Sequence, residues 1–231
     1  MDLRLLSGGA ANGLVTAVTA DFTAETGLGI SGNFGAVGGM RERFLGGEQV
    51  DLLILTRANI EALAGEGLVV AETIADLGKV VTGVARKSGS PPVDVSSSET
   101  LRAALAGADA IYCPDPKKAT AGIHFARVLD RLGLSGEVAA RLRLYPNGQT
   151  AMAAMAAGSD ANPIGCTQIT EILNTEGVKY MGALPGDLGL ATVYTAAVSV
   201  GAAHPEAARR LIAILTAVER EDLRQRIGFS R

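Results

Sequence analysis

Two adjacent lysines, Lys117 and Lys118, precede a segment with helical periodicity and form the clearest chemical signal in the chain. The apolar positions of that segment recur at i, i+3, i+4 and i+7, as Phe125, Val128, Leu129 and Leu132, which predicts an amphipathic helix. Thr120 is the expected N-cap, so the free N–H groups of the first turn, at Ala121 and beyond, would lie beside the two lysines. Charge, helix dipole and unpaired donors would together favour a bound anion. The alternative is that both lysines are solvated and Thr120 only caps the helix.

The elements before this helix predict a sheet of parallel strands. Strand-like segments at 3–6, 30–34 and 50–55 are each followed by a turn and a helical segment. Three such units in succession predict a parallel sheet covered by helices, with ligands bound outside the carboxyl ends of its strands. The residues expected around that crevice come from the three strand ends and turns: Ser7, Gly9, Ala10, Phe34, Ala36, Val37, Thr56 and Arg57.

A second set of α/β elements follows a polar turn at 86–92. The expected elements are a helix near 99–105, a strand at 110–113, the lysine turn with its helix, a helix at 150–157, a strand at 163–167, a strand at 191–200, and helices at 204–216 and 220–227. The fold class is therefore α/β. The chain shows no internal repeat and no apolar segment long enough to span a membrane, so membrane insertion is not expected.

The composition is that of an ordinary globular protein, with 48% hydrophobic and 19% charged residues. A net charge of −3, an aromatic content of 4% and the absence of Trp argue against nucleic acid as a partner. An acidic protein still binds anions where donors are arranged locally, because bulk charge acts mainly on solubility and encounter.

Neither a cofactor nor a metal is predicted. The glycine-rich turn at 8–13 has Ala10 where a dinucleotide fingerprint has its middle glycine, and the second strand ends without an acid to bind a ribose. Cys113 and Cys166 lie in apolar strand-like runs, which predicts two buried thiols, although their number also allows a disulfide. Ser7, Asp115 and His124 have the residue types of a catalytic triad, but Ser7 lacks the pattern of a nucleophile elbow.

The N-terminal residues lead directly into a strand and a glycine turn, without the regions of a signal peptide. The chain as written is therefore expected in the cytoplasm. A periplasmic location is expected instead if Met1 stands where a signal peptide has been removed.

Several short motifs occur in a fixed order: the opening strand and glycine turn, Asp51-Leu52-Leu53-Ile54 after Gly47, Asp115-Pro116 before Ala121-Gly122-Ile123, Ile164-Gly165, and Arg226-Ile227-Gly228-Phe229. Their order resembles the extracellular solute-binding family of the bacterial molybdate-binding proteins, over nearly the whole chain. The resemblance implies a two-lobed type 2 periplasmic-binding-protein fold, each lobe a mainly parallel sheet flanked by helices. The implied lobes are 1–82 with 190–231, and 83–189, joined by two crossovers, with a ligand enclosed between them by hinge motion.

The resemblance implies an anionic ligand, but several ligand positions differ from the family pattern. The molybdate binders use serine hydroxyls in the first two loops, where this chain has Ala10 and Val37. The position of the family's ligand tyrosine falls on Gln168, and a small residue of the third loop falls on Thr56. Each charge-assisted hydrogen bond that is not made costs about 1.5–3 kcal/mol. Molybdate is therefore not the expected natural ligand.

The altered crevice combines an apolar patch with polar side chains, which suits a small organic carboxylate. The apolar residues are Ala10, Phe34, Ala36 and Val37, and the polar ones are Thr56, Thr120, Asn147, Gln149, Thr150, Thr167 and Gln168. Arg57 is a candidate bidentate clamp for a carboxylate, or else a solvated arginine at the rim. Thr167 and Gln168 have the alternative role of satisfying local backbone at a strand end.

Two functions follow from the resemblance. A binding protein needs only donors and a hinge, and an exported one would have an ABC transporter permease as its partner. The family also resembles aconitate isomerase, which interconverts the cis and trans forms of a tricarboxylate by an allylic proton shift. For that reaction His124 is the candidate acid and base, and Lys117, Lys118 and Arg57 are candidate carboxylate clamps. The alternative for His124 is a partly buried helix residue without a chemical role.

Overall fold

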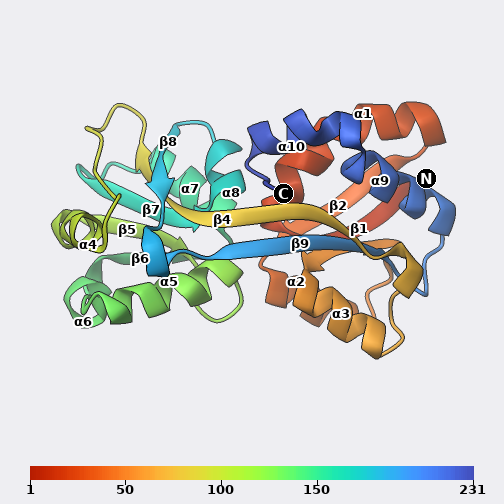
Figure 1. Cartoon of the computed structure of the whole chain (residues 1–231), viewed down its shortest axis with the longest axis horizontal. Coiled ribbons are helices and arrows are strands. Elements are labelled where there is room, and N and C mark those ends of the chain that lie inside the picture. The colour runs from red at the N-terminus through yellow and green to blue at the C-terminus, as the bar shows by residue number, and fades with distance from the viewer. The chain divides into compact units, whose positions relative to one another are not determined.

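The computed structural model describes residues 1–231, and the chain divides into two compact units (Figure 1). Unit 1 contains Met1–Val80 and Thr192–Arg231, and unit 2 contains Val81–Ala191. Strand β4 (Ala75–Lys87) and strand β9 (Ala191–Val198) extend across the unit boundaries in sequence. Helices flank strands in both units, which confirms the predicted α/β fold class.

In unit 1 the strands pair in the order β2-β1-β3-β9. The elements of unit 1 are β1 (Asp2–Gly8), η1 (Gly9–Ala11), α1 (Asn12–Thr26), β2 (Gly29–Gly35), α2 (Val37–Leu45), β3 (Leu52–Thr56), α3 (Arg57–Gly65), η2 (Ala71–Thr73), α9 (Pro205–Thr216), η5 (Val218–Arg220) and α10 (Glu221–Ile227). β1 is parallel to β2 and β3, and β9 is antiparallel to β3. The three predicted strand–turn–helix units are therefore present.

The core of unit 1 is built from aliphatic strand residues and from one face of α1. Leu5 and Leu6 of β1 are fully buried, as are all apolar residues of β3. The residues expected to form the buried face of α1 all do so: Leu14, Val15, Val18 and Phe22. Helices α1 and α9 cover one face of this sheet, and α2 and α3 cover the other (Figure 1).

Helix α2 begins earlier than the sequence predicts. The turn that the sequence predicts after the second strand lies at 35–39, a segment with three glycines. In the structure, Ala36 is the N-cap in an extended conformation and Val37 is the first helical residue. Val37 is 5% exposed, and a Cβ added to Gly8 would lie 3.0 Å from its Cγ2. Packing of Val37 against β1 thus overrides the low helix propensity of the glycines.

In unit 2 the strands pair in the order β4-β7-β5-β6, and β8 pairs with the other edge of β4. The elements of unit 2 are α4 (Ser98–Gly107), β5 (Ala110–Pro114), α5 (Thr120–Arg131), α6 (Ser135–Val138), η3 (Ala139–Arg141), β6 (Leu142–Tyr145), α7 (Gly148–Ala157), β7 (Pro163–Gln168), α8 (Ile169–Leu173), β8 (Val178–Ala183) and η4 (Gly186–Leu188). β5 is parallel to β6 and β7, whereas β4 is antiparallel to β7 and β8.

The sheet of unit 2 separates two buried clusters. One cluster contains Leu101 and Leu105 of α4 and Phe125 of α5, and the other contains Met152 of α7 and Ile172 of α8. In Figure 1 the helices accordingly lie on two sides, with α4, α5 and α6 on one and α7 and α8 on the other. The predicted face of α5 is buried as well.

Cys113 and Cys166 are free, buried thiols in the first of these clusters, as the sequence predicts. Burial raises the pKa of the Cys113 thiol to about 12 and raises the pKa of Cys166 well above its usual value. The thiolate is the reactive form of cysteine, and a raised pKa disfavours it. We therefore assign both side chains to the core and not to a reactive centre.

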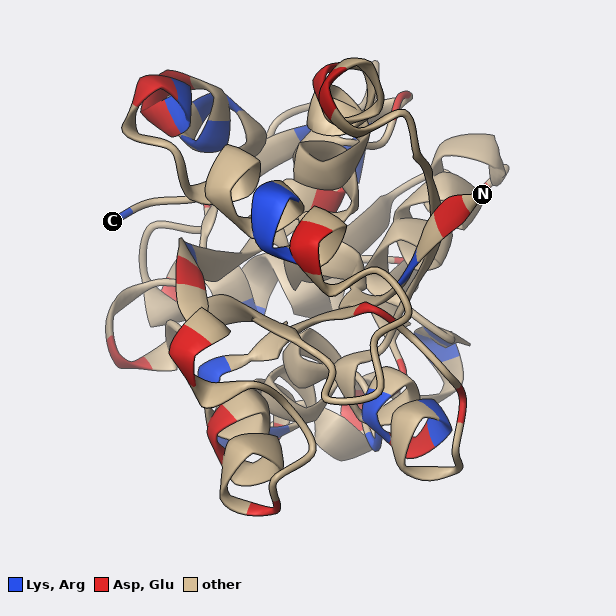
Figure 2. Cartoon of the chain, turned by 90° about the vertical axis from the view of Figure 1, so that its right-hand side faces the viewer, with Lys and Arg blue, Asp and Glu red and all other residues tan.

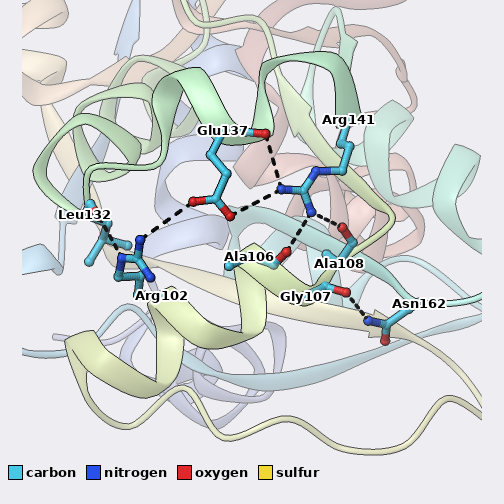
Figure 3. Close-up of polar contacts among 8 residues, drawn as sticks. All are labelled: Arg102, Ala106, Gly107, Ala108, Leu132, Glu137, Arg141 and Asn162. Carbon is cyan, nitrogen blue, oxygen red and sulfur yellow. Dashed lines mark hydrogen bonds and ion pairs between the residues drawn. The ribbon is translucent and has the colours of Figure 1, made fainter.

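Arg141 joins three segments of unit 2 (Figure 3). Its Nη1 donates to the carbonyl of Ala106 at 2.8 Å and to the carbonyl of Ala108, so it satisfies acceptors at the end of α4. Its Nη2 lies 3.8 Å from the carboxylate of Glu137, which also faces Arg102 at 3.7 Å. A cation at a helix C-terminus interacts favourably with the helix dipole, so Arg141 fixes α4 to the α6–η3 segment.

Residues of positive and negative charge are interspersed along the ribbon (Figure 2). None of the helices is both long and apolar enough to cross a lipid bilayer.

Candidate functional site

In unit 1, the site residues expected from the sequence lie at neighbouring carboxyl ends of parallel strands. Ser7 of β1 is in register with Phe34 of β2 and Ile54 of β3. The following turns therefore start side by side. They carry the remaining expected residues of this unit: Gly9, Ala10, Ala36, Val37, Thr56 and Arg57.

The turn after β1 is closely packed and its polar side chain is used internally. Ser7 is fully buried, and its hydroxyl donates to the carbonyl of Gly8 at 2.9 Å. Ala10 is 1% exposed. A Cβ at Gly8 would lie 2.9 Å from the Tyr194 ring, so only glycine fits this position. The Ser7 hydroxyl thus stabilises the turn. In the neighbouring strand β2, the ring of Phe34 lies over Gly32.

Arg57 holds a carboxylate that belongs to the protein itself. Its Nε lies 3.2 Å from Oδ1 of Asp76, and its Nη2 pairs with Oδ2 of the same residue. Asp76 Oδ1 also accepts a hydrogen bond of 2.7 Å from the Thr195 hydroxyl. Thr56, the preceding residue, accepts a hydrogen bond of 2.6 Å from the Asn59 side chain.

In unit 2, the lysine turn leads into α5, but the cap differs from the expected one. Helix α5 begins at Thr120, and its N-cap is Ala119, which is extended and cannot accept a side-chain hydrogen bond. Asp115 explains the shift, because its Oδ1 accepts the N–H of Lys117 at 2.6 Å and its carbonyl accepts the N–H of Ala119 at 3.1 Å. The turn closed by Asp115 uses Ala119 as its last residue, so Thr120 is the first helical residue and not the cap.

Gly122 brings the start of α5 against the end of β5. A Cβ at this position would lie 2.4 Å from the carbonyl oxygen of Pro114 and 2.3 Å from that of Asp115. No other residue fits without moving backbone. The first-turn N–H groups at Thr120, Ala121 and Gly122 are thereby held beside the strand end, next to the exposed Lys117 and Lys118.

An open hollow of about 440 Å³ adjoins the lysine turn. It is lined by Asp115, Pro116, Lys117, Leu144, Tyr145 and Pro146. The lining combines the ammonium group of Lys117, the carboxylate of Asp115 and an apolar wall. Such a lining suits a small organic molecule with an apolar part next to a charged group.

The start of α7 brings together two more of the expected residues. Asn147 is the N-cap, and its Oδ1 accepts hydrogen bonds of 2.9 Å from both the backbone N–H and the hydroxyl of Thr150. The two side chains therefore complete a cap within one helix, and Gln149 lies between them in sequence.

Glu171, which no sequence motif singles out, lies directly behind this cap. Glu171 is 6% exposed, and its Oε2 accepts a hydrogen bond of 2.5 Å from the hydroxyl of Thr167. The N–H groups of Gln149, Gln168 and Gly148 also hydrogen-bond its carboxylate. Burial raises the pKa of this carboxyl above its usual value, although the four donors act in the opposite direction. The signal in the sequence is an acid in a short segment that also holds Ile169, Ile172 and Leu173.

His124 lies on the second turn of α5 and is partly buried. Its Nε2 is 2.8 Å from the carbonyl oxygen of Leu188, so this nitrogen carries a proton and donates it to that carbonyl. Only Nδ1 would then be able to accept a proton. Over residues 1–231 no group of three or more His, Cys, Asp and Glu side chains is arranged to hold a metal ion.

Comparisons with known proteins give this geometry a family context. The sequence profile described as bacterial extracellular solute-binding protein matches residues 3–230. An aconitate isomerase from a Pseudomonas species is 25% identical over 221 residues, which cover 92% of this chain and 81% of that protein.

Two solved structures show the same fold. The periplasmic molybdate-binding protein of Azotobacter vinelandii superposes with a TM-score of 0.81 at 17% identity, covering 100% of this chain and 99% of that one. The sulfate-binding protein of Mycobacterium tuberculosis superposes with a TM-score of 0.74 at 19% identity, covering 99% of this chain and 86% of that one. At such low identities the likeness concerns the fold and not the ligand.

Proposed function

The chain belongs to the bacterial extracellular solute-binding proteins, and from this premise we propose that it binds a small organic carboxylate. The family fold implies a small anionic ligand. We further propose that an ABC transporter permease is the partner if the protein is exported.

The observation that carries the proposal is the N-terminal turn of α5. Its cap, Ala119, has no side chain that accepts the first-turn N–H groups, in contrast to the caps of α4 and α7. Those donors lie beside Lys117 and Lys118, and the positive end of the helix dipole points the same way. A single carboxylate matches this small set of donors.

The residues of unit 1 favour an organic ligand over a tetrahedral oxyanion. Ala10 and Val37 offer no hydroxyl, and the Ser7 hydroxyl is already used by the Gly8 carbonyl. Molybdate or sulfate would therefore lack donors from these side chains, whereas the apolar surface suits carbon atoms.

A thermal-shift screen of the purified protein tests the proposal. The panel contains molybdate, tungstate, sulfate and phosphate together with mono-, di- and tricarboxylates, including both aconitate isomers. A ligand present at about 100 times its dissociation constant stabilises the protein by about 2.7 kcal/mol, which is readily detected. We expect carboxylates to raise the melting temperature. A shift with molybdate or tungstate alone would refute the carboxylate assignment.

A second function, an isomerase acting on an unsaturated polycarboxylate such as aconitate, is favoured by the likeness to the Pseudomonas enzyme. His124 is its candidate proton carrier, through Nδ1, because Nε2 is committed to Leu188. NMR spectra of cis- and trans-aconitate incubated with the protein would show interconversion. His124→Ala should abolish it while leaving binding within a few-fold, and this function is ruled out if the wild-type protein converts neither isomer.

A further inference from the structure

The chain after α10 turns back onto β4 as a short strap, residues 228–230. Gly228 ends the helix with a φ of +106°, which glycine adopts readily, and the N–H of Phe229 donates back into the helix at 2.8 Å. Ser230 then pairs with Lys79 of β4, and the two residues exchange hydrogen bonds of 2.7 and 2.8 Å between their backbone groups. The strap therefore forms an antiparallel bridge with the first half of β4.

The backbone of β4 is shaped for this close approach. Gly78 has a φ of +136°, which disfavours any residue with a side chain. A Cβ added to Gly78 would lie 2.6 Å from the carbonyl oxygen of Ser230 and 3.5 Å from Cβ of Phe229. The strap is thus held in place by paired hydrogen bonds and by direct contact with the β4 backbone.

The strap places the Phe229 side chain against Tyr194 of β9. Each of the two residues is 2% exposed, and their ring centroids lie 6.4 Å apart with the ring planes at 81°, which is an edge-to-face contact. Phe229 also lines an open hollow of about 330 Å³. Without the Phe229 ring, Tyr194 would lose a packing partner and the space beside it would connect to that hollow.

Tyr194 in turn packs against the turn after β1. A Cβ at Gly8 would lie 2.9 Å from Cε1 of Tyr194 and 3.0 Å from Cγ2 of Val37, so these two side chains enclose the Gly8 backbone. The turn continues as η1, whose start has no side-chain cap. Packing by Tyr194 and Val37 therefore has a large part in fixing the shape of this turn.

We propose that Phe229 is a positioning residue for the candidate site, because through Tyr194 it holds the turn after β1 in its observed conformation. Gly9 and Ala10 of this turn are among the residues expected at the ligand. Their backbone groups stay in place only while the Tyr194 ring does. A loosened turn would have to be ordered when a ligand binds, which lowers the affinity.

The importance of this turn for a ligand rests on the proposed function, since the turn is one of the strand ends around which the ligand is expected. The effect of Phe229 on the turn does not depend on that function. Two measurements therefore address the two claims separately. Hydrogen exchange of the protein without ligand reports on the turn, and calorimetric titration reports on binding.

Hydrogen exchange measured by NMR tests whether Phe229 holds the turn. The N–H of Asn12 donates to the Gly9 carbonyl, so its exchange rate reports how often the turn opens. The N–H of Val70 donates to the Val198 carbonyl at 2.8 Å and is the reference in the same unit. In Phe229→Ala we expect the exchange rate of the Asn12 amide to rise about tenfold more than that of the Val70 amide.

Phe229→Leu is the conservative variant, because leucine fills much of the space of the ring. It should keep the exchange rate of the Asn12 amide within about threefold of the wild-type value. An equal increase at Asn12 and Val70 in Phe229→Ala would show a general loss of stability and would overturn the proposal.

A second pair of variants leaves every buried side chain in place and decides the matter if Phe229→Ala does not fold. Ser230 is exposed, and Ser230→Pro removes the N–H that donates to the Lys79 carbonyl, whereas Ser230→Ala keeps it. We expect the Asn12 amide to exchange about threefold faster in Ser230→Pro than in Ser230→Ala. Equal rates in these two variants would refute the role of the strap.

The consequence for binding is measured with the carboxylate that gives the largest thermal shift. Calorimetric titration should show an affinity about fivefold weaker for Phe229→Ala than for the wild-type protein. Unchanged affinity despite faster exchange at Asn12 would contradict a positioning role in the site. If no carboxylate binds the wild-type protein, the proposed function fails, and hydrogen exchange still decides whether Phe229 holds the turn.

Discussion

Two glycines control how closely the backbone of unit 2 approaches its own polar groups. Gly122 lies against the carbonyl oxygens of Pro114 and Asp115, and Gly148 lies against the side chains of Thr167 and Glu171. The contact at Gly122 places the first-turn N–H groups of α5 next to the end of β5. The contact at Gly148 leaves room for the Glu171 carboxylate beneath the start of α7. A methyl group at either position would change a helix start that is part of the candidate site.

Gly122→Ala should therefore destabilise the protein by about 2 kcal/mol, since an inserted methyl group in a packed region typically costs 1–3 kcal/mol. Urea denaturation gives the free energy of unfolding. Gly136→Ala is the matched control, because Gly136 is exposed, helical and free of neighbours within 4 Å of an added Cβ. Equal stabilities of the two variants would contradict the tight contact at Gly122.

The raised pKa of Glu171 predicts a pH dependence of stability. Its ordinary value is 4.5, and burial is the largest cause of the increase. A group with a higher pKa in the folded state binds more protons there, so its contribution to stability is lost as the pH rises through the folded pKa. The free energy of unfolding of the wild-type protein, relative to Glu171→Gln, should therefore decrease as the pH increases above 4.5.

Urea denaturation between about pH 4.5 and 8 measures this difference. Glu176→Gln, which changes an exposed acid, should show no comparable trend relative to the wild-type protein. A difference between the wild-type protein and Glu171→Gln that stays constant or increases with pH would show that burial does not raise this pKa.

At the scale of elements, α5 and α7 use their N-termini in opposite ways. The first turn of α7 is capped by Asn147, whose Oδ1 accepts the N–H of Thr150, and it lies against the Glu171 carboxylate. The first turn of α5 has Ala119 as its cap and lies next to two exposed lysines. This contrast is why the proposed carboxylate is assigned to α5.

Replacing Thr120 by proline tests that assignment with little disturbance of the helix. Thr120 is the first helical residue, where proline is well tolerated, and Ala119 is already extended, as the residue before proline prefers. Thr120→Pro removes one first-turn N–H, so we expect about a tenfold loss of affinity for the best carboxylate in calorimetric titration. Thr120→Ala keeps the N–H and should bind within about two-fold of the wild-type protein. Unchanged affinity of Thr120→Pro would place the carboxylate elsewhere.

The contacts of Arg141 predict a structural role at the end of α4 (Figure 3). Arg141→Met keeps most of the side-chain length but leaves the carbonyls of Ala106 and Ala108 without their charged donor. We expect a loss of about 2 kcal/mol in the free energy of unfolding, as charged hydrogen bonds contribute about 1.5–3 kcal/mol. Arg127→Met, at an exposed position of α5, should change stability by less than about 0.5 kcal/mol. If Arg127→Met lowered the free energy of unfolding as much as Arg141→Met does, the structural role of Arg141 would be refuted.

For the molecule as a whole, the sequence predicts what depends on local periodicity and misses what depends on distant partners. The strand–turn–helix units, the buried face of α5 and the two buried thiols follow from patterns of a few residues. The pairing of Arg57 with Asp76, the burial of Glu171 under α7 and the early start of α2 depend on tertiary packing. The cap of α5 was misplaced because Asp115, four residues before Ala119, closes the turn through both its side chain and its carbonyl.

The net charge of −3 and the interspersed charges also bear on ligand recognition (Figure 2). A protein of this charge does not attract anions over long distances, so affinity has to come from local donors. The first turn of α5 with Lys117 and Lys118 is such a local arrangement, and it is the part of the molecule on which the proposed function depends.

The most direct measurement is calorimetric titration of the wild-type protein with sodium molybdate and with the carboxylate that gives the largest thermal shift. We expect a dissociation constant for the carboxylate at least about tenfold lower than that for molybdate, a difference of about 1.4 kcal/mol in binding free energy. Tighter binding of molybdate, or no binding of any carboxylate, would contradict it.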